Sequence, residues 1–99
     1  MKITVGRKGP HAHYIGRGSP LGNPFIIGRD GDRDEVCDKY QPWFDNKVAE
    51  KDPAVMAELR AIWHKANRPE GVTLGCFCAP ERCHGYTIKA YLESRTDIC

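Results

Sequence analysis

The feature that most constrains the fold is the order in which strand-like and helix-like segments follow one another. The side chains of residues 2–6 alternate in character and include β-branched residues, and residues 72–78 form a mostly apolar run. Both patterns are typical of strands. Helix-like apolar spacing fills much of the chain between them, and a further helix-like segment follows. Strands separated by helices favour a parallel sheet with helices packed on it. The sequence therefore predicts a small α/β domain with a short, mostly parallel sheet and flanking helices.

Start and stop signals place these helices along the chain. The acid-rich segment from Asp30 to Asp34 is expected to begin the first helix, because carboxylates complement the helix dipole. Pro42 falls inside the apolar pattern of that helix and predicts a kink or a break into two pieces. Asp52 and Pro53 form an N-cap and first-turn pair that opens a second helix. We expect a last helix over residues 83–94 and a short strand at residues 25–27.

Length and composition limit the kind of protein this is. The 99 residues suffice for one modest core and not for two, so residues 1–99 are expected to form a single domain. No apolar run has the length of a membrane span, and the segment that starts at Met1 lacks the apolar core of a signal peptide. We therefore expect a cytoplasmic protein with no membrane partner. Five cysteines are an odd number and favour reduced thiols over a disulfide framework.

Charge is distributed unevenly, although the formal net charge is only +2. Residues 1–29 contain five Lys/Arg and no acid, whereas residues 30–58 contain nine acids and four bases, a net charge of −5. A positive N-terminal third favours an anionic ligand there, and an ordinary polarised surface is the alternative. The chain has no dense Lys/Arg tract, and its pI of about 8.3 is below the strongly basic signature of nucleic-acid binders.

Three thiols and an imidazole lie within residues 76–84, which makes this segment the best candidate for chemistry. On a strand, Cys76 and Cys78 would point to the same face, and Cys83 and His84 would follow at the start of the next helix. Ligands of open α/β sheets bind beyond the carboxyl ends of the strands. The four groups are therefore expected to meet at one end of the sheet.

Three interpretations of this cluster stay open. In the first, Cys76, Cys78, Cys83 and His84 bind zinc, although their spacing departs from the usual two separated pairs, so a distant ligand (His11, His13 or Cys37) is a further alternative. In the second, Cys83 is a reactive thiol whose pKa is lowered by the helix N-terminus and by neighbouring basic residues. In the third, the cysteines pack as small buried residues without any chemistry.

A glycine-rich loop, residues 16–23, is the second informative segment. Its glycines let peptide N–H groups approach a ligand, while an arginine and a serine supply a charged fork and a hydroxyl. The candidate ligand-binding residues are Gly16, Arg17, Gly18, Ser19, Gly22 and Asn23. The alternative is a structural role, with Ser-Pro and Asn-Pro shaping turns around buried apolar side chains.

Both motifs together make the chain resemble a known family. The residues that carry the resemblance are 16–25, Tyr40 with Trp43, 74–80 and Cys83-His84-Gly85. On these residues the chain resembles the domain of unknown function 4326 family, which is found in phages and bacteria. The family has no established biochemical activity, so the resemblance implies a fold and not a function. Its distribution implies, by analogy, a role in nucleotide metabolism or host manipulation.

The main functional hypothesis is a domain that binds an anionic, nucleotide-like ligand between the glycine-rich loop and the turn at residues 78–84. Whether the domain also turns that ligand over stays open. In an enzyme, Cys83 or His84 would act as nucleophile or base, and Arg17 would hold a phosphate.

Two other hypotheses come from different classes of protein. The first is a non-enzymatic interaction module, stabilised by zinc or by its core, such as a phage effector that binds a host protein. Its contact surface would be the acidic stretch 30–52, with Tyr40 or Trp43 as exposed aromatic side chains. The second is nucleic-acid binding through the basic N-terminal third, which would make the affinity steeply dependent on salt.

Overall fold

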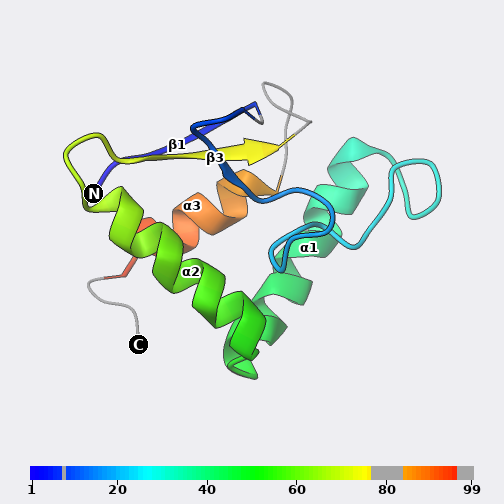
Figure 1. Cartoon of the computed structure of the whole chain (residues 1–99). Coiled ribbons are helices and arrows are strands. Elements are labelled where there is room, and N and C mark those ends of the chain that lie inside the picture. The colour runs from blue at the N-terminus through cyan, green and yellow to red at the C-terminus, as the bar shows by residue number, and fades with distance from the viewer. Residues whose placement is uncertain (8, 77–83, 96–99) are drawn as a thin grey trace.

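The computed structural model describes residues 1–7, 9–76 and 84–95, which form three strands and three helices (Figure 1). The strands are β1 (Ile3–Arg7), β2 (His13–Tyr14) and β3 (Val72–Cys76). The helices are α1 (Arg33–Ala49), α2 (Pro53–Ala66) and α3 (Gly85–Glu93).

The three strands form one parallel sheet in the order β1-β3-β2. Ile3 pairs with Val72 at the start of the register, and His13 pairs with Leu74. This architecture confirms the predicted small α/β domain with a short parallel sheet. The predicted strand at residues 25–27 is wrong, because only an isolated bridge between Ile27 and Gly31 forms there. The third strand is β2, which is only two residues long and was not predicted.

Helix α1 runs without interruption through Pro42, so of the two predicted outcomes the break into two pieces is wrong and the kink stays a prediction. Asp32 caps the helix through a reciprocal pair of bonds: its carboxylate accepts from Glu35 N at 2.9 Å, and its own N–H donates to the Glu35 carboxylate at 3.1 Å. Pro42 lies on the exposed side, whereas Tyr40 and Phe44 are fully buried. The apolar side of α1 therefore holds the helix together across a residue that disfavours it.

The predicted start of the second helix is confirmed, since the Asp52 carboxylate accepts a hydrogen bond from Val55 N at 3.1 Å and Pro53 follows in the first turn of α2. Helix α3 begins at Gly85, close to its predicted start. The predicted turn at residues 79–82 and the end of the predicted strand at residues 77–78 lie outside the described residues. None of the helices in the described part of the chain has the length and apolarity needed to cross a membrane.

The core lies between the sheet and the helices, which Figure 1 shows on one side of β1 and β3. Alternate residues of β3 point into it: Val72, Leu74 and Cys76 are all buried. Ile62 of α2 and Ile88 of α3 are fully buried in the same cluster. Because β3 is the central strand, its side chains contribute most of the sheet's share of this core. The C-terminal ends of these strands position the candidate site.

Candidate functional site

The C-terminal end of the sheet is where all three parallel strands end. Arg7 of β1 lies in register with Cys76 of β3, and Tyr14 of β2 lies in register with Gly75. Directly after β2, Ile15 N donates a hydrogen bond to Gly75 O at 3.0 Å. The glycine-rich loop therefore leaves the sheet beside the end of β3, the location at which open α/β sheets bind their ligands.

His84 links the start of the glycine-rich loop to the start of α3. Its Nε2 lies 2.6 Å from Ile15 O, and only 6% of the residue is exposed. Because a carbonyl oxygen can only accept, Nε2 carries the proton, and Nδ1 of the neutral ring carries the lone pair. Burial lowers the pKa of His84, and the hydrogen bond to Ile15 opposes this to a lesser extent. His84 is therefore neutral at pH 7.

Tyr40 of α1 holds the same loop at its other end. Its hydroxyl donates to Leu21 O at 2.8 Å, and its ring lies 4.9 Å from the His84 ring at an interplanar angle of 59°. The hypothesis that Tyr40 is an exposed contact for a partner is wrong, because its side chain is fully buried. Tyr40 and His84 together fix both ends of the segment between Ile15 and Leu21.

Three of the predicted ligand-binding residues make bonds that shape the loop itself. The Ser19 hydroxyl donates to Gly16 O at 2.7 Å, and Gly22 N donates to Ser19 O at 3.0 Å. The Asn23 side chain donates to Val36 O of α1 at 3.1 Å. A Cβ at Gly22 would lie only 2.5 Å from Gly16 O, so the chain can pass here only as glycine. These contacts are those of a rigid, internally bonded loop.

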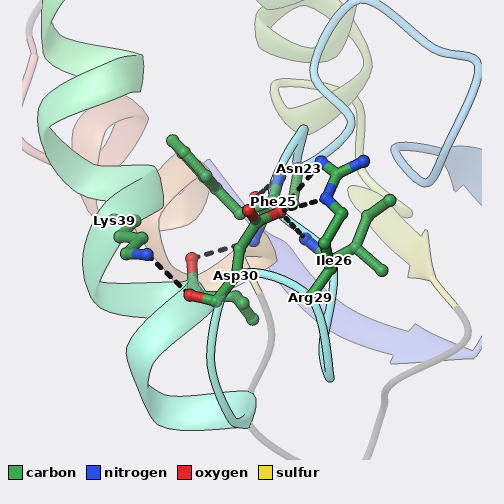
Figure 2. Close-up of polar contacts among 7 residues, drawn as sticks. Asn23, Phe25, Ile26, Arg29, Asp30 and Lys39 are labelled. Atoms are coloured by element: carbon green, nitrogen blue, oxygen red, sulfur yellow. Dashed lines mark hydrogen bonds and ion pairs between the residues drawn. The ribbon is translucent and has the colours of Figure 1, made fainter.

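The chain beyond Asn23 is fastened to α1 by a second set of polar contacts (Figure 2). Asn23 Oδ1 accepts from Phe25 N at 2.9 Å, and Asp30 Oδ2 accepts from Ile26 N at 2.8 Å. Lys39 Nζ donates to Asp30 O at 2.6 Å. The hydrogen bond from the Arg29 guanidinium, more than any other contact, lowers the pKa of the Asp30 carboxyl. Residues 23–30 therefore form a folded turn that is bonded to α1 through Val36 O and Lys39.

The tip of the loop is exposed to solvent. Ser19 N donates to Gly16 O at 3.1 Å and closes a turn in which Gly18 has φ +88°, the left-handed value that the third residue of a type II turn requires. Tyr14 Oη donates to Arg17 O at 2.7 Å and fixes the orientation of this turn. Arg17 and Gly18 are exposed. Within the described ranges, the Arg17 guanidinium has no hydrogen-bond or ion-pair partner.

The cysteine cluster is described only in part. Cys76 and Cys37 are buried, whereas Cys78 and Cys83 lie outside the described residues. Over residues 1–7, 9–76 and 84–95, no three His, Cys, Asp or Glu side chains gather closely enough to hold a metal ion. His13 is a poor distant zinc ligand, because its two ring nitrogens lie against Lys65 and Glu58. Zinc binding by Cys76, Cys78, Cys83 and His84 stays a prediction.

Sequence reasoning missed a second polar region, at the N-terminal end of the sheet. There, His13 is a residue of β2 whose side chain is 10% exposed. It lies beside Lys65 near the end of α2 and borders a cavity of about 530 Å³. The only signal in the sequence was the alternation of His11 and His13, which says nothing about contacts with α2.

A parallel sheet with helices on one side, and a glycine-rich loop at its C-terminal end, define a small α/β domain. The family model for Domain of unknown function (DUF4326) matches residues 2–94, and the chain belongs to this family. No match to the chain is found among curated proteins or among solved structures.

Proposed function

We propose that this domain binds an anionic, nucleotide-like small ligand at the C-terminal end of its sheet, between the glycine-rich loop and the turn at residues 78–84. The hydrogen bond between His84 Nε2 and Ile15 O carries this proposal. It joins the start of the loop to the segment that follows β3, although the two are 69 residues apart. Such a junction beyond the carboxyl ends of parallel strands is the usual ligand position in open α/β sheets.

The charge at this end of the sheet supports an anionic ligand. Arg17 is exposed at the tip of the loop, and Arg7 is exposed at the end of β1. Guanidinium groups bind phosphate and carboxylate oxygens in a bidentate manner, which adds geometric specificity to the charge. In this arrangement Arg17 and the peptide groups of Gly18 contact the ligand, and Ser19 and Asn23 maintain the shape of the loop.

His84 acts in this proposal as a positioning residue. Its Nε2–H is used by Ile15, and the residue is almost completely buried, which limits its access to a substrate. A neutral imidazole does keep a lone pair on Nδ1, the requirement for a base or a metal ligand. The contacts of His84 nevertheless favour binding over turnover, because its packing partners are the Tyr40 ring and the loop backbone.

Isothermal titration calorimetry with adenosine monophosphate tests the proposal, with adenosine as the uncharged control. We expect binding of the phosphate compound only, and we expect Arg17→Ala to weaken it about tenfold or more, because a hydrogen bond to a charged group contributes about 1.5–3 kcal/mol. Arg60→Ala removes an equal charge from the exposed side of α2 and should leave the affinity unchanged. Equal affinities of wild type and Arg17→Ala, or no binding of any nucleotide by the wild type, would refute the proposal.

A further inference from the structure

A cavity of about 530 Å³ lies at the N-terminal end of the sheet, opposite the loop site. Residues 10–13, at the start of β2, form one wall. Residues 70–73, at the start of β3, form another, and Lys65 and Arg68 from the C-terminal end of α2 complete the lining. The volume falls in the range of about 300–1,000 Å³ that is typical of small-molecule sites.

His13 fixes the position of the Lys65 ammonium group at this cavity. Lys65 Nζ lies 2.8 Å from His13 Nδ1, and Glu58 Oε1 lies 3.5 Å from His13 Nε2. An ammonium group can only donate, so Nδ1 accepts and the proton of the neutral ring is on Nε2, facing Glu58. Burial, and then the positive charge of Lys65, lower the pKa of His13, and Glu58 opposes this to a lesser extent. The neutral ring thus acts as a rigid support for the ammonium group.

This arrangement suits binding rather than proton transfer. Since burial lowers the pKa of His13, its ring stays neutral and accepts from the ammonium group. The remaining N–H groups of Lys65 are available to a bound acceptor.

Arg68 adds a second cation to the wall. Its Nε donates to Lys65 O at 3.3 Å and lies 3.1 Å from the Glu70 carboxylate. The two terminal nitrogens of the guanidinium have no hydrogen-bond partner among the residues that the structure describes. Glu70 is the one acid among the described residues of the lining, and its side chain is 64% exposed, so solvent screens its charge.

The backbone of β3 supplies a further donor. Val72 N donates to Lys2 O at 3.0 Å on the β1 side, so Thr73 N–H points to the opposite side, toward β2. The pairing of β2 begins only at His13 with Leu74, and Thr73 N–H has no backbone partner across the described ranges. An open peptide donor at the wall of a cavity is a group that a ligand oxygen can satisfy.

From these donors we propose that the cavity binds a small molecule through an oxyanion group, either a phosphate or a carboxylate, held by Lys65, Arg68 and Thr73 N–H. The described lining contains one ammonium group, one guanidinium fork and one open peptide N–H, against one carboxylate that solvent screens. It therefore offers more donor groups than a single carboxylate can use. The volume exceeds that of an oxyanion alone, which leaves room for the body of the ligand beside the apolar atoms of Val72 and Pro10. The proposal is independent of the loop site.

Amide-detected NMR titrations with inorganic phosphate and with acetate test this site, each against sodium chloride at equal ionic strength. Phosphate, acetate or both should shift the Thr73 and His13 amide resonances saturably, and the tighter of the two identifies the group that the natural ligand carries. Lys65→Gln and Arg68→Gln should each weaken this binding about tenfold or more. Arg60→Gln on the exposed side of α2 is the charge-matched control and should leave the affinity unchanged.

Arg68→Gln keeps the test valid if Lys65→Gln disturbs folding, because the Arg68 side chain is 51% exposed and contributes little to the core. Arg17→Ala should leave the cavity shifts intact, which separates this site from the loop site. Shifts that sodium chloride reproduces, an equal loss of affinity in Arg60→Gln, or no saturable shift with either anion would overturn the proposal.

Discussion

Replacing His84 by phenylalanine isolates the hydrogen bond that joins the glycine-rich loop to α3. Phenylalanine keeps an aromatic ring against Tyr40 but cannot donate to Ile15 O, which His84 Nε2 reaches at 2.6 Å. Ile15 is fully buried, so water cannot easily replace the lost donor. The substitution therefore leaves one buried carbonyl oxygen without its partner.

The expected cost follows from that unsatisfied carbonyl. Leaving one buried acceptor without a donor destabilises a protein by about 1–3 kcal/mol. With a urea m-value of about 1–3 kcal/mol/M for a small domain, a loss of about 2 kcal/mol lowers the urea midpoint by about 1 M. A total stability of about 5–15 kcal/mol would leave the variant folded in the absence of denaturant.

Equilibrium urea denaturation, followed by tryptophan fluorescence, measures this loss. His84→Gln is the matched control, because its side-chain amide can donate to the same carbonyl oxygen, and it should recover part of the stability. Tyr40→Phe removes the bond to Leu21 O at the other end of the loop and should cost about 1–3 kcal/mol for the same reason. A midpoint of His84→Phe equal to that of wild type would refute the reasoning.

Wild type and His84→Gln should differ in how their free energy of unfolding depends on pH. Burial lowers the pKa of folded His84, so as pH falls below about 6.5 the unfolded chain takes up the proton first and the free energy of unfolding decreases. His84 makes its full contribution above that pH, and the loss amounts to at most about 1.4 kcal/mol per pH unit. His84→Gln lacks this loss, whereas His13 titrates in both proteins. The advantage of wild type over His84→Gln should therefore shrink between about pH 7.5 and pH 5.5, and a constant difference would contradict a buried neutral imidazole.

Three further predictions concern stability and reactivity. Gly18→Ala should lower the free energy of unfolding by about 1–2 kcal/mol, because φ is +88° although an added Cβ would have no heavy atom within 4 Å. Gly22→Ala should cost more, because its Cβ would lie 2.5 Å from a backbone oxygen. Thermal unfolding that ranks the two variants the other way would contradict the loop geometry. Pro42→Ala should stabilise the protein by about 1–3 kcal/mol, since proline disfavours an exposed helix interior, and an unchanged urea midpoint would count against it. The buried Cys37 and Cys76 thiols should react with a thiol reagent far more slowly in the native than in the denatured protein, as peptide mapping of the labelled sites would show; equal rates would contradict their burial.

The parts of the fold that local chemistry specifies could be predicted from the sequence. Asp52 and Pro53 give a helix start that depends on neighbouring residues alone, and the β-branched run at residues 3–5 gives a strand. Strand β2 could not be predicted, because two residues carry no periodicity and their pairing depends on an open side of β3. Pro42 does not break α1 for a related reason: burial of distant side chains outweighs one unfavourable residue in a helix of 17.

The candidate site, too, could be predicted from the sequence only in part. The meeting of the glycine-rich loop with the start of α3 follows from parallel topology, which the sequence indicated. The use of the Ser19 and Asn23 side chains within the fold was one of the two interpretations that the sequence left open, because short polar side chains readily bond to nearby backbone. The cavity at the other end of the sheet depends on a contact between His13 and Lys65 across 52 residues, for which a single sequence carries no signal.

The position of β3 in the sheet has a consequence for how the chain folds during synthesis. In the described part of the chain, β1 and β2 each pair with β3 and not with each other. At a synthesis rate of about 5–20 residues per second, roughly 3–14 s separate the completion of Arg7 from that of Cys76. During this interval the N-terminal strand has no partner in its own chain, so the nascent protein exposes an unpaired strand until its last third emerges. Conditions that slow translation should therefore favour aggregation of this domain more than that of a protein whose neighbouring strands are consecutive in sequence.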